Sequence, residues 1–341
     1  MRFGPVPLAE AEGAILAHSQ ALGDGGRLRK GRALGAADIA ALAAAGLAEV
    51  IVARLEPGDV GEDEAARRLA AALVPDPDSA GLRLTAPFTG RVNLNAAGPG
   101  IVALDAAAVA RLNRIDPAIT LATLAPYARV AKGTLAGTVK IIAYGVAEAA
   151  LDAACAAARA AIAVRPVVLR TGGLILTRIA GQDEKLARKG EEAIAARLKA
   201  LGMTLAETRL VAHETGAIAE ALHGLAGEIA LILTGSATSD LHDVGPEAVR
   251  RAGGRIERFG MPVDPGNLLF LGEADGRKVI GLPGCARSPA LNGADWVLER
   301  LVCGLPVSSE DIAAMAVGGL LKEIPIRPQP REARGTAGGA G

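Results

Sequence analysis

Hydrophobic and polar positions alternate most regularly in the second half of the chain. Short runs rich in Val, Ile and Leu recur there and are separated mostly by stretches with apolar residues at helical spacing, such as 185–201, which ends at Gly202. This alternation predicts an α/β fold with a mostly parallel sheet and right-handed crossovers. The expected strands are 167–169, 208–211, 228–233, 255–259 and 278–282.

The first half of the chain shows a less regular mixture of short patterns. Strand-like runs there alternate with Ala-rich helical stretches such as 36–45 and 62–73. This mixture predicts smaller α+β modules ahead of the main domain. The expected parts are a strand–helix–strand module (1–57), a small α+β module (58–150), a connecting helix (151–165), the α/β domain (166–305) and an extension (306–341) whose Pro-, Gly- and Ala-rich end is expected to be disordered.

Composition and charge narrow the range of partners. Half of the 341 residues are hydrophobic but only 2% are aromatic, and 37 basic residues balance 37 acidic ones. A chain without net positive charge and with few aromatic rings does not favour binding to nucleic acid, so any anionic ligand must be held locally. The sequence shows no signal-peptide pattern and no membrane segment, which predicts a cytoplasmic protein with reduced cysteines.

Small and polar residues follow the expected strands of the α/β domain. In an open parallel sheet, ligands bind beyond the carboxyl ends of the strands. The hydroxyl-rich segment 234–243 follows one expected strand and enters a helix at Gly245 and Pro246. Such a loop can donate several hydrogen bonds to a phosphate, but its Ser and Thr side chains can equally serve only as helix caps and turn residues.

Two further loops resemble the first in composition. Segment 260–267 follows one strand, and 283–289 follows another, with Ser288 as the expected N-cap of a helix and Pro289 as its first residue. Arg287 beside this helix start is either an anion ligand or a solvated surface arginine. Because all three loops are expected at one edge of one sheet, together they predict a binding site.

In this order, the loops resemble the molybdopterin-binding fold of the molybdopterin adenylyltransferases and the molybdopterin molybdenumtransferases, best over 166–305. The family's Met-Lys-Pro-Gly-Lys loop is similar to 263–267, and its Leu-Pro-Gly-Asn-Pro-Val-Ser loop is similar to 282–288. Segment 31–52 adds weaker support. The resemblance implies a three-layer α/β/α domain. Residues that match the family's Thr-Gly-Gly-Thr-Gly loop and the helix after it are Thr234, Gly235, Asp243, Pro246 and Glu247.

The resemblance implies a role in molybdenum cofactor biosynthesis, closest to that of a molybdenumtransferase, which cleaves adenylylated molybdopterin and inserts molybdate. It implies catalytic roles for Asp243, Asp240 and Glu214, with Mg²⁺ bound at Asp243. A homodimer is expected from the same layout. The residues implied in binding molybdopterin are Thr234, Gly235, Ser236, Thr238, Ser239, Pro265, Gly266, Pro283, Gly284, Arg287 and Ser288.

Some positions depart from the family pattern. Asp264 and Asn267 stand where the family has two lysines, and an Asp there would repel molybdate. Glu214 follows a histidine where the family has an acidic pair, and Ser236 and Thr238 replace two glycines. These departures keep two alternatives open. One is a non-enzymatic carrier that hands molybdopterin to a nucleotidyltransferase or a target enzyme, and the other is a pyrophosphatase acting on nucleotide sugars or dinucleotides.

Overall fold

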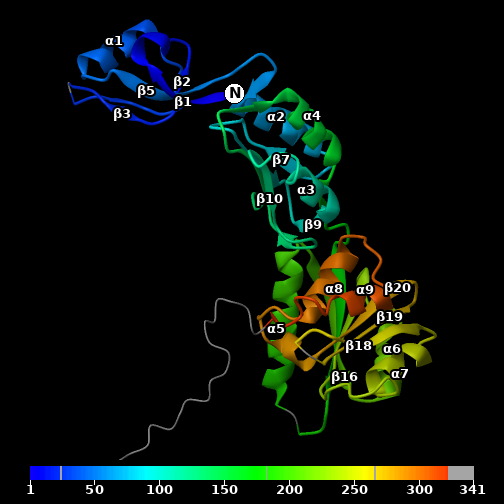
Figure 1. Ribbon diagram of the computed structural model, residues 1–341. Coiled ribbons are helices and arrows are strands. Elements are labelled where there is room, and N and C mark those ends of the chain that lie inside the picture. The colour runs from blue at the N-terminus through cyan, green and yellow to red at the C-terminus, as the bar shows by residue number, and fades with distance from the viewer. Residues whose placement is uncertain (24, 182, 265, 322–341) are drawn as a thin grey trace, which may run out of the picture. The chain divides into compact units, whose positions relative to one another are not determined.

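The computed structural model describes residues 1–23, 25–181, 183–264 and 266–321 (Figure 1). The chain divides after Pro166 into two compact units. Pro265 and the end of the expected extension, 322–341, lie outside the described residues. Among the described residues, no helix combines the length and the apolar character that crossing a membrane requires.

The first unit begins with a small sheet of its own. Strands β1 (Arg2–Pro7), β5 (Glu49–Arg54) and β2 (Ile15–Leu16) pair in the order β1-β5-β2, and both pairings are antiparallel. Helix α1 (Ala36–Ala44) matches the expected helix, and its residue Leu42 joins the core of this module. The remaining elements are the 3₁₀ turn η1 (Leu8–Glu10) and the strands β3 (Gln20–Ala21) and β4 (Arg27–Leu28).

A second core fills the rest of the first unit. It lies between α2 (Glu62–Leu73), which has the predicted bounds, and several short antiparallel strands. Helices α3 (Ala106–Leu112) and α4 (Glu148–Ala157) pack on each other and close this core. The strands of this core are β6 (Asp59–Gly61), β7 (Leu82–Leu84), β8 (Arg91–Ala96), β9 (Gly100–Leu104), β10 (Ile119–Thr123), β11 (Arg129–Val130), β12 (Leu135–Ile141), β13 (Gly145–Ala147) and β14 (Ile162–Pro166). They form three sheets, in the orders β10-β12-β8-β7, β11-β9-β14 and β13-β6.

The predicted connecting helix over 151–165 is wrong in its second half. Helix α4 ends at Ala157, and β14 then pairs with β9 in an antiparallel ladder. The Ala-rich composition hid this change, because alanine has high helix propensity wherever it occurs. Leu151 and Ala154 are fully buried in the second core, so α4 belongs to this core and does not act as a linker.

The second unit is a six-stranded sheet in the order β16-β15-β17-β20-β19-β18. The first four strands are parallel, and β19 pairs antiparallel with both β20 and β18. This agrees with the mostly parallel sheet expected from the sequence. The strands are β15 (Thr171–Arg178), β16 (Thr204–Ala212), β17 (Ile229–Leu233), β18 (Arg255–Met261), β19 (Asn267–Ala274) and β20 (Arg277–Leu282).

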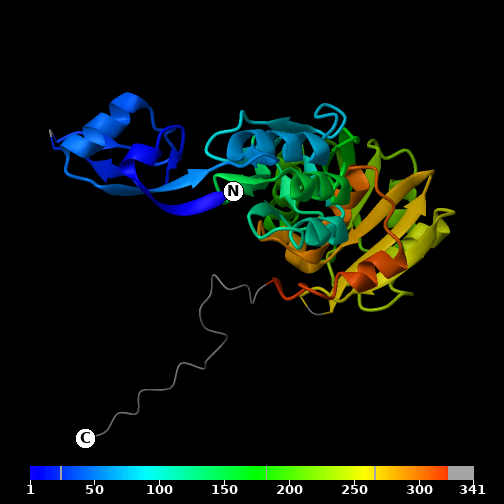
Figure 2. The same ribbon diagram turned by 45° about the horizontal axis from the view of Figure 1, so that its top comes forward.

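Helices cover both faces of this sheet and give three layers (Figures 1 and 2). Alternate residues of a strand point to opposite faces. Thus Ile175 and Ile232 pack with α6 (Thr215–Leu222) and α7 (Val244–Arg251), while Leu233 approaches Gly190 of α5 (Glu184–Ala200) on the other face. The unit also contains η2 (Gly284–Arg287), α8 (Gly293–Val302) and α9 (Ser309–Ala314).

Two strands of the sheet were missed by the hydrophobic pattern. The strand expected at 167–169 is instead β15, which begins at Thr171 and contains Gly172 and Gly173. A side chain at Gly173 would meet the carbonyl oxygen of Ala226 at 2.3 Å, so the packing requires glycine there. Strand β19 forms a hairpin with β20 through Asp275 and Gly276, both at positive φ. Asp-Gly between apolar runs is a strong hairpin signal that could have revealed it.

Gly281 gives a direct test of the packing in the second unit. A Cβ atom at Gly281 of β20 would lie 1.9 Å from the Phe270 ring, which is fully buried. We expect Gly281→Ala to lower the free energy of unfolding by about 3 kcal/mol, as overpacking of a tight core does. Urea unfolding measures this change. Gly216→Ala in α6 is the matched control, because its Cβ would meet only Arg251 at 3.8 Å; an equal loss there would contradict the packing argument.

Asp38 predicts how the N-terminal module responds to acid. Its carboxylate accepts hydrogen bonds from the Gly35 N–H at 3.1 Å and from Arg32 Nε at 2.9 Å, and these contacts lower the pKa of Asp38. A lowered pKa stabilises the fold above the unfolded-state value, and this contribution is lost as the pH falls through the folded-state value. We therefore expect Asp38→Ala to lower the Tm at pH 7 and to converge with wild type only well below about pH 4, once the pH has fallen through the lowered folded-state pKa of Asp38. Exposed Glu49→Gln serves as the control, and a difference that persisted in acid would be evidence against this role.

Candidate functional site

Five strands of the C-terminal sheet end at the same edge. Strands β15, β16, β17 and β20 are parallel, and β18 runs in the same direction because β19 is antiparallel to both of its neighbours. The segments 213–214, 234–243, 262–264 and 283–288 therefore all leave the sheet at its carboxyl edge, where α/β proteins bind ligands. The three loops singled out from the sequence thus share one edge.

The loop after β17 is held against the ends of β15 and β16. Thr234 is buried, and its hydroxyl donates to the Ser236 carbonyl at 2.7 Å. The Gly235 N–H donates to Thr177 Oγ1 at 2.7 Å, and the same hydroxyl lies 2.9 Å from Nδ1 of His213. Sequence analysis did not identify Thr177, because the strand that carries it was placed too early in the chain.

The next part of this loop offers hydrogen-bond donors. Within the described part of the chain, the backbone N–H groups of Ser236, Ala237 and Thr238 have no acceptor. Ser236 and Ala237 are exposed, whereas Thr238 is buried. Three consecutive N–H donors in a loop beyond a parallel strand can bind an anion or the polar edge of a ring.

Arg287 connects this loop to the one after β20. Its Nη2 donates to the Thr234 carbonyl at 2.6 Å, while its Nε is buried and has no partner among the described residues. Burial lowers the pKa of the Arg287 guanidinium. The arginine is thus half-buried and bound to the loop, and does not match the alternative of a solvated surface residue.

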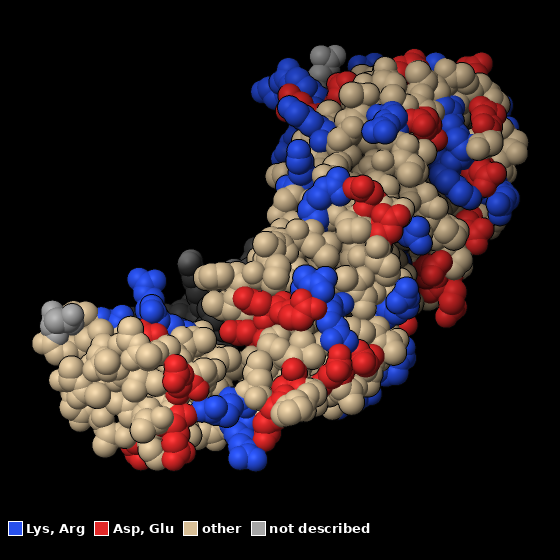
Figure 3. Space-filling model, turned by 90° about the horizontal axis from the view of Figure 1, so that it is seen from above, with Lys and Arg blue, Asp and Glu red and all other residues tan. Residues whose placement is uncertain are grey.

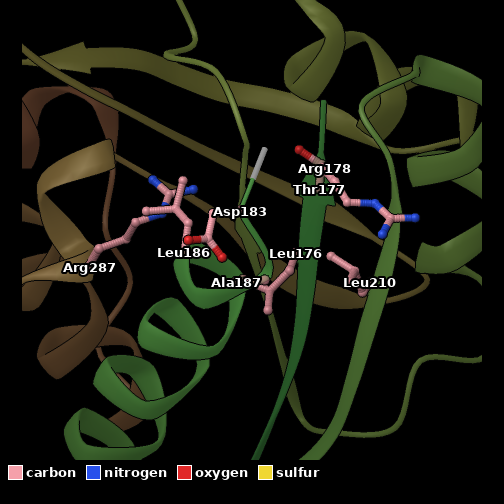
Figure 4. A pocket seen from close by; sticks show the side chains of 8 residues that line it. All are labelled: Leu176, Thr177, Arg178, Asp183, Leu186, Ala187, Leu210 and Arg287. Carbon is pink, nitrogen blue, oxygen red and sulfur yellow. The ribbon is translucent and has the colours of Figure 1, made fainter. Parts of the chain in front are cut away.

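A pocket beside Arg287 combines apolar walls with charged groups. Side chains from β15, β16, η2 and the start of α5 line it, as Figure 4 shows. Asp183 is the N-cap of α5, because its carboxylate accepts from the Lys185 N–H at 2.8 Å. The cavity itself is small, about 10 Å³, which is room for one water molecule, so a larger ligand can contact only its mouth, where Leu186 and Leu210 are exposed. The lining residues are Leu176, Thr177, Arg178, Asp183, Leu186, Ala187, Leu210 and Arg287.

The three predicted acidic catalytic residues differ in surroundings. Asp243 is the N-cap of α7: Oδ1 accepts from the Val244 N–H at 2.7 Å and Oδ2 from the Ser239 N–H at 2.8 Å. Asp240 is exposed and accepts from the His242 N–H at 2.8 Å. Glu214 is exposed at the start of α6. In this structure Asp243 therefore shapes the loop with both of its oxygens.

The described residues do not fit the Mg²⁺ expected at Asp243. They contain no group of three His, Cys, Asp or Glu side chains that could hold a metal ion. Both oxygens of Asp243 already accept backbone hydrogen bonds. No step of the chemistry is therefore assigned to this ion.

The loop after β18 carries Asp264 and Asn267 at the two positions where the molybdopterin-binding family has lysines. Asp264 has a positive φ of 52°, and its Oδ1 is buried without a partner in the described residues. Asn267 is buried as the first residue of β19, and its Oδ1 accepts from the Leu269 N–H at 3.1 Å. Gly266 is exposed, and Pro265 lies outside the described residues. Neither family lysine position thus places a positive charge here.

The predicted N-cap role of Ser288 is wrong. Helix α8 begins at Gly293, and Asn292 caps it in a box with Asp295: Asn292 Oδ1 accepts from the Ala294 N–H and Asp295 Oδ2 from the Asn292 N–H, both at 2.9 Å. This reciprocal box satisfies two backbone donors, which a serine further upstream cannot do. Ser288 instead ends η2 and is exposed, as is Gly284, while Pro283 is buried.

Known proteins match parts of the chain. Residues 183–302 match the family model of a probable molybdopterin binding domain, and residues 5–54 match a domain of unknown function. No curated protein matches the chain. Among solved structures, the molybdopterin biosynthesis MoeA protein from Pyrococcus horikosii is 12% identical, with a TM-score of 0.30 over 89% of this chain and 75% of that one. A likeness at that TM-score supports no inference about this chain.

The family match covers the three loops whose geometry is described above, from the start of α5 to the last turn of α8. It supports a role in molybdenum cofactor biosynthesis. The part of the chain from 183 to 302 is thus similar to a probable molybdopterin binding domain.

Proposed function

We propose that this protein binds molybdopterin at the carboxyl edge of the C-terminal sheet, as a step in molybdenum cofactor biosynthesis. The observation that carries the proposal is the row of three N–H donors at 236–238, on the loop that Arg287 holds, for which the described residues offer no acceptor. Molybdopterin offers a phosphate and a flat ring with polar edges. Donors on one loop and the apolar mouth of the pocket beside it supply complementary surfaces for both parts.

Each part of the site has a role in this proposal. The N–H groups of Ser236, Ala237 and Thr238 donate to the phosphate oxygens, and Arg287 adds a positive charge close to them. Thr234 and Gly235 use their own donors inside the loop, so they shape the site and do not contact the ligand. Leu186 and Leu210 are exposed at the mouth of the pocket and provide an apolar surface for the ring. Figure 3 shows basic and acidic side chains interspersed on one face of the molecule, so attraction of the anion is local.

The enzymatic form of the proposal is a molybdenumtransferase-type reaction. Adenylylated molybdopterin would be cleaved with release of AMP, and molybdate would be transferred to the pterin. Of the three acidic residues, Asp240 and Glu214 are the ones whose exposed carboxylates remain available for this chemistry. Positioning of the ligand by the loop donors would then supply most of the rate enhancement.

The second candidate is a carrier that binds the ligand and passes it on, to a nucleotidyltransferase or a target enzyme. The specific observation in its favour is the chemistry at Asp243 and Asp264. The first carboxylate is engaged in capping α7, and the second places an acidic group where the resemblance led us to expect a lysine. A carrier needs the binding donors but neither of those charges.

Binding of molybdopterin tests the proposal directly. We expect Arg287→Ala to raise the Kd for molybdopterin about tenfold or more, because a charge-assisted contact in a half-buried site is lost. Isothermal titration calorimetry on the full chain measures this. The matched control is Arg255→Ala, an exposed arginine at the amino end of β18, which pairs only with surface glutamates. Failure of the wild-type protein to bind molybdopterin and its adenylylated form would refute the proposed function.

Release of AMP distinguishes the enzyme from the carrier. Glu214 carries one of the two exposed carboxylates, and Glu214→Gln removes its charge at nearly constant size. If the chain is an enzyme that uses this carboxylate, AMP release from adenylylated molybdopterin in the presence of molybdate should fall at least about 100-fold with an unchanged Kd. Chromatography of the released nucleotide measures it. Unchanged turnover would remove Glu214 from the catalytic residues, and no turnover in wild type would favour the carrier.

A further inference from the structure

Arg197 is an almost fully buried arginine that lies outside the three ligand loops. It belongs to α5, its exposed fraction is 9%, and it forms an ion pair with Asp295 of α8 at 2.7 Å. Burying a guanidinium is costly unless every part of it is paired. In this structure its remaining donors all find backbone carbonyl groups.

Apart from the Ala193 carbonyl of its own helix, which accepts from Nη1 at 3.4 Å, these carbonyl groups belong to one short segment. Arg197 donates from Nη1 to the Ala286 carbonyl at 2.8 Å, and from Nη2 to the carbonyls of Ser288 at 2.7 Å and Ala290 at 3.1 Å. The segment 286–290 contains no strand or α-helix, and Ser288, Pro289 and Ala290 are exposed. The bonds to Arg197 therefore replace the backbone pairing that regular secondary structure would supply.

Arg287 lies between two of the residues that are held in this way. The carbonyls of Ala286 and Ser288 flank it in sequence, and its own guanidinium extends to the Thr234 carbonyl on the loop after β17. A change in the path of the segment would therefore move the Arg287 side chain relative to the three donors at 236–238.

We infer that Arg197 is a positioning residue: it fixes the path of 286–290 and so places Arg287 for the anionic group of the ligand. The inference rests on the proposed function, because the ligand is molybdopterin. It assigns no contact between Arg197 and the ligand. Arg197 acts through the segment alone.

Lysine cannot replace Arg197 in this role. The bonds use Nε, Nη1 and Nη2 in the planar geometry of the guanidinium, and they reach acceptors in different directions. A lysine ammonium retains the charge opposite Asp295 but provides one compact donor centre. Arg197→Lys therefore preserves the ion pair and releases most of the carbonyl groups.

Arg277 provides a matched control at the other end of the sheet. It also bonds three backbone carbonyls, that of Leu222 at the end of α6 and those of Leu225 and Gly227 in the loop that follows, but this loop precedes β17 and lies at the amino edge. Arg277→Lys removes the same kind of support from a loop that carries no ligand residue. Any effect shared by the two variants reflects stability alone.

The experiment uses the full chain in two assays. Hydrogen–deuterium exchange of the ligand-free protein reports on the amides of Ala286 and Ser288, which are bonded to the carbonyls of Pro283 and Cys285. Calorimetry then gives the Kd for molybdopterin. For Arg197→Lys we expect faster exchange at 284–292 and a Kd about tenfold higher, whereas Arg277→Lys should leave both unchanged. If the lysine variant does not fold, Arg197→Gln is measured in the same way.

A double-mutant cycle separates positioning from general destabilisation. When Arg287 is already Ala, adding Arg197→Lys should raise the Kd less than about twofold further, because the residue that it positions is gone. Additive effects, or an unchanged Kd in the single variant, would overturn the inference. If wild-type protein binds no molybdopterin, the proposed function fails, and exchange at 284–292 alone then decides whether Arg197 holds the segment.

Discussion

The Phe270 ring sets how closely the elements of the C-terminal domain can approach one another. It is fully buried in β19, and it occupies space that two glycines leave open, Gly281 in the neighbouring strand and Gly245 in the first turn of α7. A Cβ at Gly245 would lie 2.9 Å from this ring. Because the first turn of α7 packs directly against the sheet, the loop between β17 and α7 has to reverse direction at the carboxyl edge. The position of the candidate site thus depends on a packing contact behind it.

Local signals in the sequence predicted some elements well. Helix α2 has the predicted bounds, and α7 begins beside the predicted Gly245 and Pro246, because amphipathic spacing and turn residues act within a few positions. Strand β15 was misplaced because Gly172 and Gly173 weaken its apolar pattern, although close packing on the 225–227 loop requires glycine at position 173. The cap of α8 was misplaced because Ser288 and Asn292 both suit an N-cap, and only the pairing with Asp295 decides between them.

In the candidate site too, nearby residues determine some features and residues distant in the sequence determine others. The loops were recognisable because glycine, proline and hydroxyl residues follow apolar strands. Thr177 of β15 and His213, which follows β16, come together only in the folded sheet. Their contacts decide that the Gly235 N–H is used inside the loop. No sequence pattern connects Arg197 with Ala286 either, since the two are 89 positions apart. Residues that carry ligand contacts can thus be predicted from motifs, whereas residues that support them require the fold.

The bonds of Arg197 also limit how this domain can be recombined. The segment 286–290 depends on a side chain from a helix far upstream, so it is not a self-contained module. Transplanted into another α/β domain, it would leave three carbonyl groups without a donor unless the recipient helix offered an arginine at the matching turn. Exchanging this loop between proteins of the same fold therefore requires two changes, one in the loop and one in the helix that supplies the arginine. A chimera designed from the loop sequence alone would contain the residues of the loop but would not hold their conformation.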